Sequence, residues 1–165
     1  MVHLGVILVC CIIVGIVHAE GGCQQQTNAD AWGSITGPGS GHYLLTNSTR
    51  QDAKDCFNVT VPTNKDTKPA DYTFGYREGT EWKSGTGKVD GNGNQISALV
   101  NEQNSTATLL YSDGKTCEVT SYNGGFDLWT HSANTNDANS CCKTLFDKKV
   151  SESGKNGKNL RENCS

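Results

Sequence analysis

From residue 20 onward, short segments of alternating apolar and polar residues are separated by clusters of glycine, asparagine, serine and aspartate. Alternation with a period of two is typical of β-strands with one buried face, and helical periodicity is nearly absent from most of the chain. Eight strands are predicted, at residues 42–49, 56–61, 72–77, 80–89, 95–100, 106–112, 116–122 and 126–131. Tight turns between them favour hairpin connections. The pattern predicts an all-β fold, most economically an eight-stranded antiparallel up-and-down β-barrel.

Aromatic residues gather on one face of a predicted strand. Tyr72, Phe74 and Tyr76 share this face, while Thr73 and Gly75 take the other. Inward rings of this kind fill a barrel or line a ligand cavity. The sequence does not decide between core and pocket for Tyr72, Tyr76 or Trp82.

One longer helix is predicted after the strands. It is capped by Ser140 or Asn139, and Cys142, Leu145, Phe146 and Lys149 or Val150 form its apolar stripe, which is expected to pack on the barrel wall. A short helical turn is predicted at residues 30–32, with Trp32 plugging the closed end of the barrel. Residues 151–163 are rich in lysine and asparagine and are predicted to be extended surface chain.

The N-terminus has the features of a secretory signal peptide. An apolar run at residues 4–17 ends in Val17-His18-Ala19, so cleavage after Ala19 would leave one domain at residues 20–165. No later stretch could span a bilayer as a helix. The formal net charge of −3 is too small to indicate nucleic acid or an anionic membrane surface as a partner. We therefore expect a secreted extracellular protein with neither kind of partner.

Cysteines and glycosylation acceptors support export. Of eight cysteines, Cys10 and Cys11 fall in the predicted leader, and the remaining six allow fifteen disulfide pairings between which spacing cannot decide. No Cys/His spacing resembles a metal site. Three Asn-x-Ser/Thr acceptors predict N-linked sugar at Asn47, Asn58 and Asn104.

Motifs of catalysis and of phosphate binding are missing from the sequence. Gly85-Thr86-Gly87 and Gly91-Asn92-Gly93 do not lie between a strand and a helix, so they are interpreted as turn glycines. There is no Gly-x-Ser-x-Gly elbow, and His42 and His131 have no catalytic motif around them. We predict no enzymatic activity and no cofactor.

The segment from Cys117 to Trp129 carries the most chemistry. If Cys117 is bridged to the helix, its side chain points out of the barrel and Glu118 points inward. The face taken by Asp127 stays open, because the hairpin register is unknown, and acids on a hairpin are often simply solvated. A carboxylate inside an apolar barrel requires a cationic or hydrogen-bonding partner, and Trp129 offers an ammonium group a π-face.

This segment resembles the salivary lipocalins of ticks, above all the soft-tick histamine and serotonin binders and the related pigeon-tick allergen. The resemblance covers nearly the whole mature chain and is carried by short motifs: Asp30-Ala31-Trp32, Lys54-Asp55-Cys56, residues 111–117, Asp127-Leu128-Trp129, Cys141-Cys142 and Cys164. The family's amine-binding pattern is Cys-Asp-aliphatic, at least seven residues, Glu-Leu-Trp/Tyr, at least eleven residues, then Cys. Here Cys117-Glu118-Val119, seven residues, Asp127-Leu128-Trp129, eleven residues and Cys141 keep the spacing, while the two acids are exchanged.

The resemblance implies a lipocalin β-barrel with a C-terminal helix packed against it and three disulfides. The implied pairs are Cys23–Cys141, Cys56–Cys164 and Cys117–Cys142. It also implies that Glu118 and Asp127 hold the cationic nitrogen of histamine or serotonin, while Trp129, Tyr43 and Phe74 stack on its ring. A leukotriene scavenger and a complement-binding modulator are the alternatives, and a monomer is expected.

Overall fold

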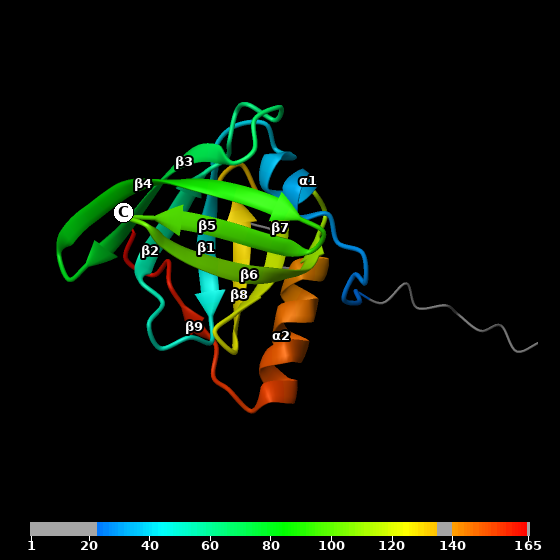
Figure 1. Ribbon diagram of the computed structural model, residues 1–165. Coiled ribbons are helices and arrows are strands. Elements are labelled where there is room, and N and C mark those ends of the chain that lie inside the picture. Colours follow the sequence, from blue (N-terminus) through cyan, green and yellow to red (C-terminus); the bar gives the residue numbers. More distant parts are fainter. Residues whose placement is uncertain (1–22, 135–139, 165) are drawn as a thin grey trace, which may run out of the picture.

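The computed structural model describes residues 23–134 and 140–164, so the predicted signal peptide and the alternative cap Asn139 lie outside the described residues. Eight strands form the body of the molecule: β1 (His42–Ser48), β2 (Asp55–Thr60), β3 (Ala70–Glu78), β4 (Glu81–Asn92), β5 (Gln95–Val100), β6 (Gln103–Ser112), β7 (Cys117–Tyr122) and β8 (Gly125–His131). Each pairs antiparallel with the next, and β1 pairs with both β2 and β8. The sheet therefore closes into the predicted eight-stranded antiparallel barrel (Figure 1).

All eight predicted strands are present, and the main differences lie at their ends. Strand β4 continues to Asn92, where Asp90 and Asn92 pair with Ser97 and Gln95 of β5. The sequence around Gly91 is typical of a turn, but the turn itself is displaced to Gly93, which has a positive φ of 55°. Long twisted hairpin strands thus tolerate the small polar residues that the sequence analysis assigned to a loop.

Helix α2 (Cys141–Ser153) packs on the outside of the barrel, as predicted (Figure 1). Ser140 caps it by accepting a hydrogen bond from the Lys143 backbone N–H, and Gly154 ends it in the left-handed conformation. The buried stripe of α2 contacts the outward side chains of β6, β7 and β8. This cluster contains Leu110, Cys117, Val119, Leu128, Cys142, Leu145 and Phe146, with Val150 at its edge.

Helix α1 (Ala31–Thr36), capped by Asp30, covers one end of the barrel. The backbone N–H of Ala31 donates to the Gly93 carbonyl in the β4–β5 turn. A Cβ atom on Gly91 would lie 2.5 Å from the Trp32 backbone nitrogen, so only glycine permits this approach. The Lys68 ammonium group lies 4.6 Å from the centroid of the half-buried Trp32 ring. The residue of α1 that lines the cavity is Ile35, so the plugging role of Trp32 stays a prediction.

The prediction for residues 151–163 is wrong in two respects. The helix continues to Ser153, and β9 (Lys158–Asn159) then pairs with the end of β1. Leu160 follows it and is buried against Leu45 and Ala53. A single leucine among polar residues is a weak sequence pattern, yet it anchors this segment to the barrel.

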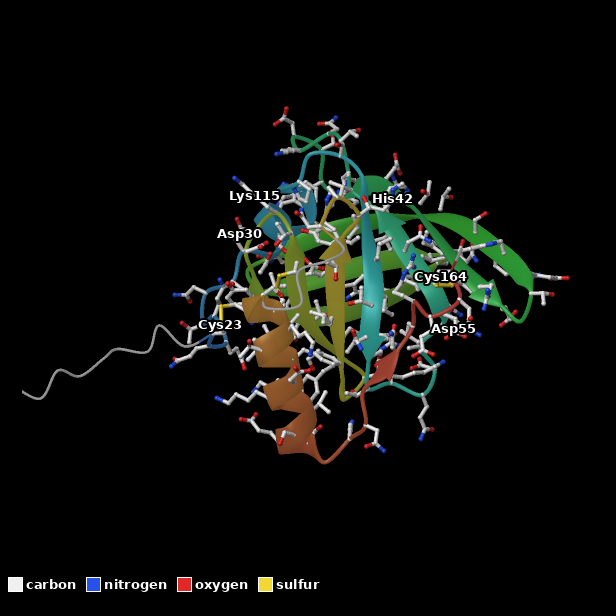
Figure 2. The ribbon with its side chains drawn as sticks, turned by 180° about the vertical axis from the view of Figure 1, so that it is seen from behind. Cys23, Asp30, His42, Asp55, Lys115 and Cys164 are labelled. Atoms are coloured by element: carbon white, nitrogen blue, oxygen red, sulfur yellow. A yellow bond between two sulfur atoms is a disulfide. The ribbon has the colours of Figure 1, made fainter. Side chains whose placement is uncertain are left out.

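Three disulfides tie the termini to the barrel with the pairing that the resemblance implied: Cys23–Cys141, Cys56–Cys164 and Cys117–Cys142. Figure 2 shows Cys164 beside the start of β2, near Asp55, and Cys23 near the first turn of α2. Trp82 is not in the core or the pocket, because its side chain is 56% exposed near the tip of the β3–β4 hairpin. Among the described residues, no helix has the length and apolar character needed to cross a bilayer.

The three glycosylation acceptors differ in their surroundings. Asn104 is exposed in β6. Asn58 is half-buried, and its Nδ2 donates to the carbonyls of Cys56 and Gly75 at 3.1 and 3.2 Å. Asn47 is half-buried where β1 pairs with β9. N-glycosylation uses the amide nitrogen, so a sugar on Asn58 would displace both of its hydrogen bonds.

We expect sugar on Asn104 and little or none on Asn58 when the protein is secreted from a eukaryotic host. Peptide mass spectrometry after enzymatic deglycosylation in heavy-oxygen water measures occupancy at each asparagine. The variant Asn104→Gln is the matched control and should remove most of the added mass. Full occupancy of Asn58 in correctly folded protein would contradict this expectation.

Candidate functional site

A cavity of about 310 Å³ lies inside the barrel. This is near the lower end of the ~300–1,000 Å³ range of small-molecule sites. Its wall is mainly apolar and aromatic, with rings from Tyr43, Phe57, Tyr72, Tyr122 and Trp129. The charged side chains on the wall are Arg50, Asp52, Lys54, Glu118 and Asp127. The volume suits one compact ligand with a ring system.

The cavity extends from the end covered by α1 to the end where β1 and β7 finish. Ile35 of α1 lines the covered end, together with Tyr43 and Glu118. Asp52 lines the opposite end, and its side chain is 67% exposed, so the cavity reaches solvent there. A ligand would enter past Asp52 and reach Glu118 last.

Alternation along β7 and β8 brings both acids of the sequence motif into this cavity. Cys117 and Val119 pack outward against α2, which turns Glu118 and Thr120 inward. On β8, Leu128 packs outward, and Asp127 and Trp129 therefore face the cavity. The inward position predicted for Glu118 is confirmed, and the undecided face of Asp127 is the inner one.

Glu118 is a buried carboxylate with little polar support. Its side chain is 5% exposed, and the Ser34 hydroxyl of α1 donates to Oε2 at 2.5 Å. Within the part of the chain that the structure describes, no lysine, arginine or histidine forms an ion pair with it. Burial raises the pKa of Glu118 from its ordinary value near 4.5 to about 7, and the Ser34 hydrogen bond opposes this only in part.

Asp127 has a different environment, because it is already paired within the protein. Arg50 Nε donates to Oδ2 at 3.0 Å and to Oδ1 at 3.2 Å, and the Ser48 hydroxyl donates to Oδ1 at 2.6 Å. Burial raises the pKa of Asp127, and the Arg50 charge and the Ser48 hydrogen bond offset part of this effect. Asp127 thus has a resident cation, whereas Glu118 has none.

The predicted aromatic residues divide into two groups. Trp129 lines the cavity, its Nε1 donates to the Thr120 hydroxyl at 3.1 Å, and its ring meets Phe57 edge-on. Tyr43 also lines the cavity and donates its hydroxyl proton to the Ser34 carbonyl, while burial, followed by the Glu118 charge, raises the pKa of this phenol. Both rings are thus fixed by hydrogen bonds to the protein.

Phe74 is not among the residues that line the cavity. Its ring packs beside Tyr72 and Phe57, with centroids 6.1 Å from each, and these two rings form the wall instead. Gly85 leaves space for it, because a Cβ there would lie 2.5 Å from the Phe74 ring. Phe74 therefore packs beside these two wall residues, on the same face of β3 as Tyr72.

Sequence reasoning missed Arg50 and Ser34, the polar partners of the two acids. Arg50 follows the end of β1, where the pairing with β8 shifts register between Leu45 and Asn47, so simple alternation could not place it. Ser34 reaches Glu118 from α1 across 84 positions of sequence. Alternation along the second strand would have indicated the inward ring of Phe57. Tyr72, undecided between core and pocket from sequence, lines the cavity.

Comparison with known proteins identifies the family. The model of the family described as tick histamine binding protein matches residues 22–164. The chain belongs to the tick histamine-binding protein family. The chain is similar to moubatin from Ornithodoros moubata, with 26% identity over 135 residues. This alignment covers 79% of this chain and 78% of moubatin.

A solved structure similar to this family member is the crystal structure of an AM182–serotonin complex. It superposes with a TM-score of 0.74 and 28% identity, over 86% of this chain and 95% of the AM182 chain. The barrel of this family member is therefore a lipocalin fold, as the sequence resemblance implied.

The raised pKa of Glu118 predicts how pH changes the stability of the ligand-free protein. The folded state holds the Glu118 proton more tightly than the unfolded state, so this stabilisation is complete below about pH 4.5 and is lost as pH rises to about 7. A shift of this size corresponds to about 3 kcal/mol in the free energy of unfolding. Glu118→Gln does not titrate, so the stability of the wild-type protein should fall relative to this variant between pH 4.5 and pH 8.

Urea unfolding of the two proteins at both pH values measures this difference. The variant Glu102→Gln, which changes an exposed acid in the β5–β6 turn, is the matched control and should follow the wild type at each pH. Equal pH dependence for the wild type and Glu118→Gln would contradict the buried, unpaired state of Glu118.

Proposed function

We propose that this protein is a secreted salivary lipocalin that sequesters a biogenic amine, histamine or serotonin, and thereby suppresses inflammation and haemostasis in the host. The observation that carries the proposal is Glu118, a buried carboxylate in an aromatic cavity without a cation from the described part of the protein. An ammonium group bound there supplies the missing charge. Membership of the tick histamine-binding protein family and similarity to a serotonin-complexed structure support the same ligand class.

In the proposed complex, the ammonium group meets Glu118 at the covered end, and the aromatic ring lies toward Trp129 and Tyr43. Each ring that faces the ammonium group adds a cation–π attraction of about 0.5–2 kcal/mol, depending on desolvation. Trp129 and Tyr43 are fixed by hydrogen bonds, so binding loses little side-chain entropy. Sequestration requires no chemical step, and no enzymatic activity is part of the proposal.

Secretion is supported by the sequence and by the disulfides. The leader-like N-terminus and three disulfides are typical of an exported protein. A scavenger would meet its ligand in the extracellular fluid of the host. A closed barrel has few free strand edges, which supports a monomer.

A leukotriene is a poorer fit for this cavity. A lipid carboxylate directed to the covered end would meet the like charge of Glu118. The two cations on the wall are already engaged, Arg50 with Asp127 and Lys54 with Glu78. Leukotrienes B4 and C4 belong in the same binding experiments as competing ligands, and retention of a plasma protein by the immobilised lipocalin would favour complement binding instead.

Isothermal titration of the disulfide-intact protein with serotonin and histamine tests the proposal. We expect one amine to bind per molecule, and Glu118→Gln to lower its affinity roughly 10- to 100-fold, because a hydrogen bond to a charged group contributes about 1.5–3 kcal/mol. Glu102→Gln should bind like the wild type. Binding of leukotriene alone, or amine binding that survives Glu118→Gln unchanged, would overturn the proposal.

Amine affinity should depend on pH, since ammonium binds the ionised form of Glu118. As pH falls through about 7 the carboxylate takes up a proton, and affinity should approach a tenfold loss per pH unit below this value and level off above it. Tyr43 and Asp113 are the other acidic groups near Glu118, and the Asp113 charge raises its pKa further. Serotonin suits the titration because its amine stays protonated from pH 5.5 to 8.

Two readouts check this dependence. Binding at pH 7 should release a fraction of a proton, which appears as a difference in binding heat between buffers of different ionisation enthalpy. Glu118→Gln should show a flat affinity profile over the same pH range. A wild-type profile as flat as that of the variant would place the ammonium group elsewhere.

A further inference from the structure

The cavity wall has two buried carboxylates, Glu118 and Asp127, and among the described residues only Asp127 of the two is paired with a cation. In the β7–β8 ladder, Glu118 is opposite Trp129 and Thr120 is opposite Asp127. The two acids are therefore separated by two residue positions along the barrel, or about 7 Å. A ligand with cationic groups at both ends could in principle meet both acids.

Arg50 prevents this because it already forms an ion pair with the Asp127 carboxylate. Its Nε contacts both carboxylate oxygens of Asp127, its Nη1 lies 2.9 Å from Asp52, and the guanidinium carbon is 5.1 Å from the centre of the Tyr122 ring. The side chain is only 13% exposed, and its backbone N–H donates to the Ser48 hydroxyl that also binds Asp127. The ion pair is thus fixed in place before any ligand arrives.

We propose that Arg50 is a specificity-determining residue: it supplies from the protein the cation that Asp127 would otherwise take from a ligand. The cavity then accepts one ammonium group, at Glu118, and a neutral group at the Arg50–Asp127 end. This inference rests on the proposed function, because it assumes that the ligand is an amine bound by Glu118.

The pairing also determines what the far end of the cavity recognises. The buried Arg50–Asp127 pair has no net charge but offers both an acceptor and donors. The second partner of Arg50, Asp52, is 67% exposed, so solvent screens its charge. A hydroxyl group on an aromatic ring satisfies such a pair, whereas a second ammonium group is repelled by the guanidinium and a carboxylate by Asp127. The favoured ligands are therefore monoamines with a neutral hydrogen-bonding ring.

A charge-exchange experiment tests this role with two probes of equal length. 1,5-Diaminopentane carries a cation at each end, and 5-aminopentanoate carries one cation and one anion. Displacement of serotonin, followed by titration calorimetry, gives the affinity of each probe relative to serotonin. In the wild type, neither the second cation of 1,5-diaminopentane nor the carboxylate of 5-aminopentanoate should improve binding. Both probes should therefore bind far more weakly than serotonin.

Two variants should move these affinities in opposite directions. Arg50→Gln leaves the Asp127 charge free, so the affinity of the diamine relative to serotonin should rise tenfold or more. Asp127→Asn removes the buried partner of Arg50 and leaves it only the 67% exposed Asp52, so 5-aminopentanoate should gain instead. Arg50→Lys keeps the cation but not the guanidinium contacts with both Asp127 oxygens and Tyr122. Its diamine affinity should therefore rise less than that of Arg50→Gln.

The outcomes separate this inference from the proposed function. Serotonin binding that depends on Glu118, combined with unchanged probe preferences in both variants, would overturn the role of Arg50 and leave the amine proposal standing. A wild type that binds no amine would overturn both. Thermal unfolding shows whether each variant is folded, and either variant can test the inference alone because each has its own predicted probe. The double variant Arg50→Gln/Asp127→Asn should return both probes to their wild-type affinities.

Discussion

Packing of α2 on the outer face of β6, β7 and β8 determines which side chains enter the cavity. The Cys117–Cys142 disulfide and the contacts of Leu145 and Phe146 hold one face of β7 and β8 outward. Because a strand alternates its side chains, a shift of one residue would exchange Glu118 for Val119 on the cavity wall. The hydrophobic surface of a helix outside the barrel thereby selects the polar groups inside it.

Once turned inward, Glu118 meets an environment that opposes its charge. Transfer of an ionised carboxylate from water into an apolar site is unfavourable unless a cation or several hydrogen bonds compensate, and Ser34 supplies one hydrogen bond. The group responds by retaining its proton to a higher pH. In the empty cavity at neutral pH, the ionised Glu118 carboxylate therefore lacks a compensating charge. A bound cation would offset the unfavourable free energy of burying this charge and would lower the pKa of Glu118 again. Stability of the empty protein and affinity for a cation are two aspects of the same buried charge.

The barrel was predictable from sequence because its determinants are local. Period-two alternation and tight turns located all eight strands, and the Ser140 cap and the stripe of Cys142, Leu145 and Phe146 located α2. The inward face of Glu118 followed from the same alternation once Cys117 was taken to be bridged. What escaped prediction depends on tertiary contacts: the register shift in β1 that directs Arg50 to Asp127, the reach of Ser34 from α1, and the burial of Leu160. Phe74 shares the inner face of β3 with Tyr72, as alternation indicates, but it packs beside the rings that line the cavity, a contact that alternation alone does not record.

The two acids of the motif show why charge and spacing alone do not define a binding site. Both lie on inner faces of adjacent strands, and both are almost fully buried, with 5% of Glu118 and 2% of Asp127 exposed. Their neighbours separate them: the wall beside Glu118 offers a serine hydroxyl, and the wall beside Asp127 offers a guanidinium group held by Asp52 and Tyr122. A protein cation that is already desolvated and positioned has little to lose by pairing, whereas a ligand ammonium must give up its water and its freedom. An internal arginine therefore competes successfully for Asp127, and the carboxylate without such a neighbour is the one left for a ligand.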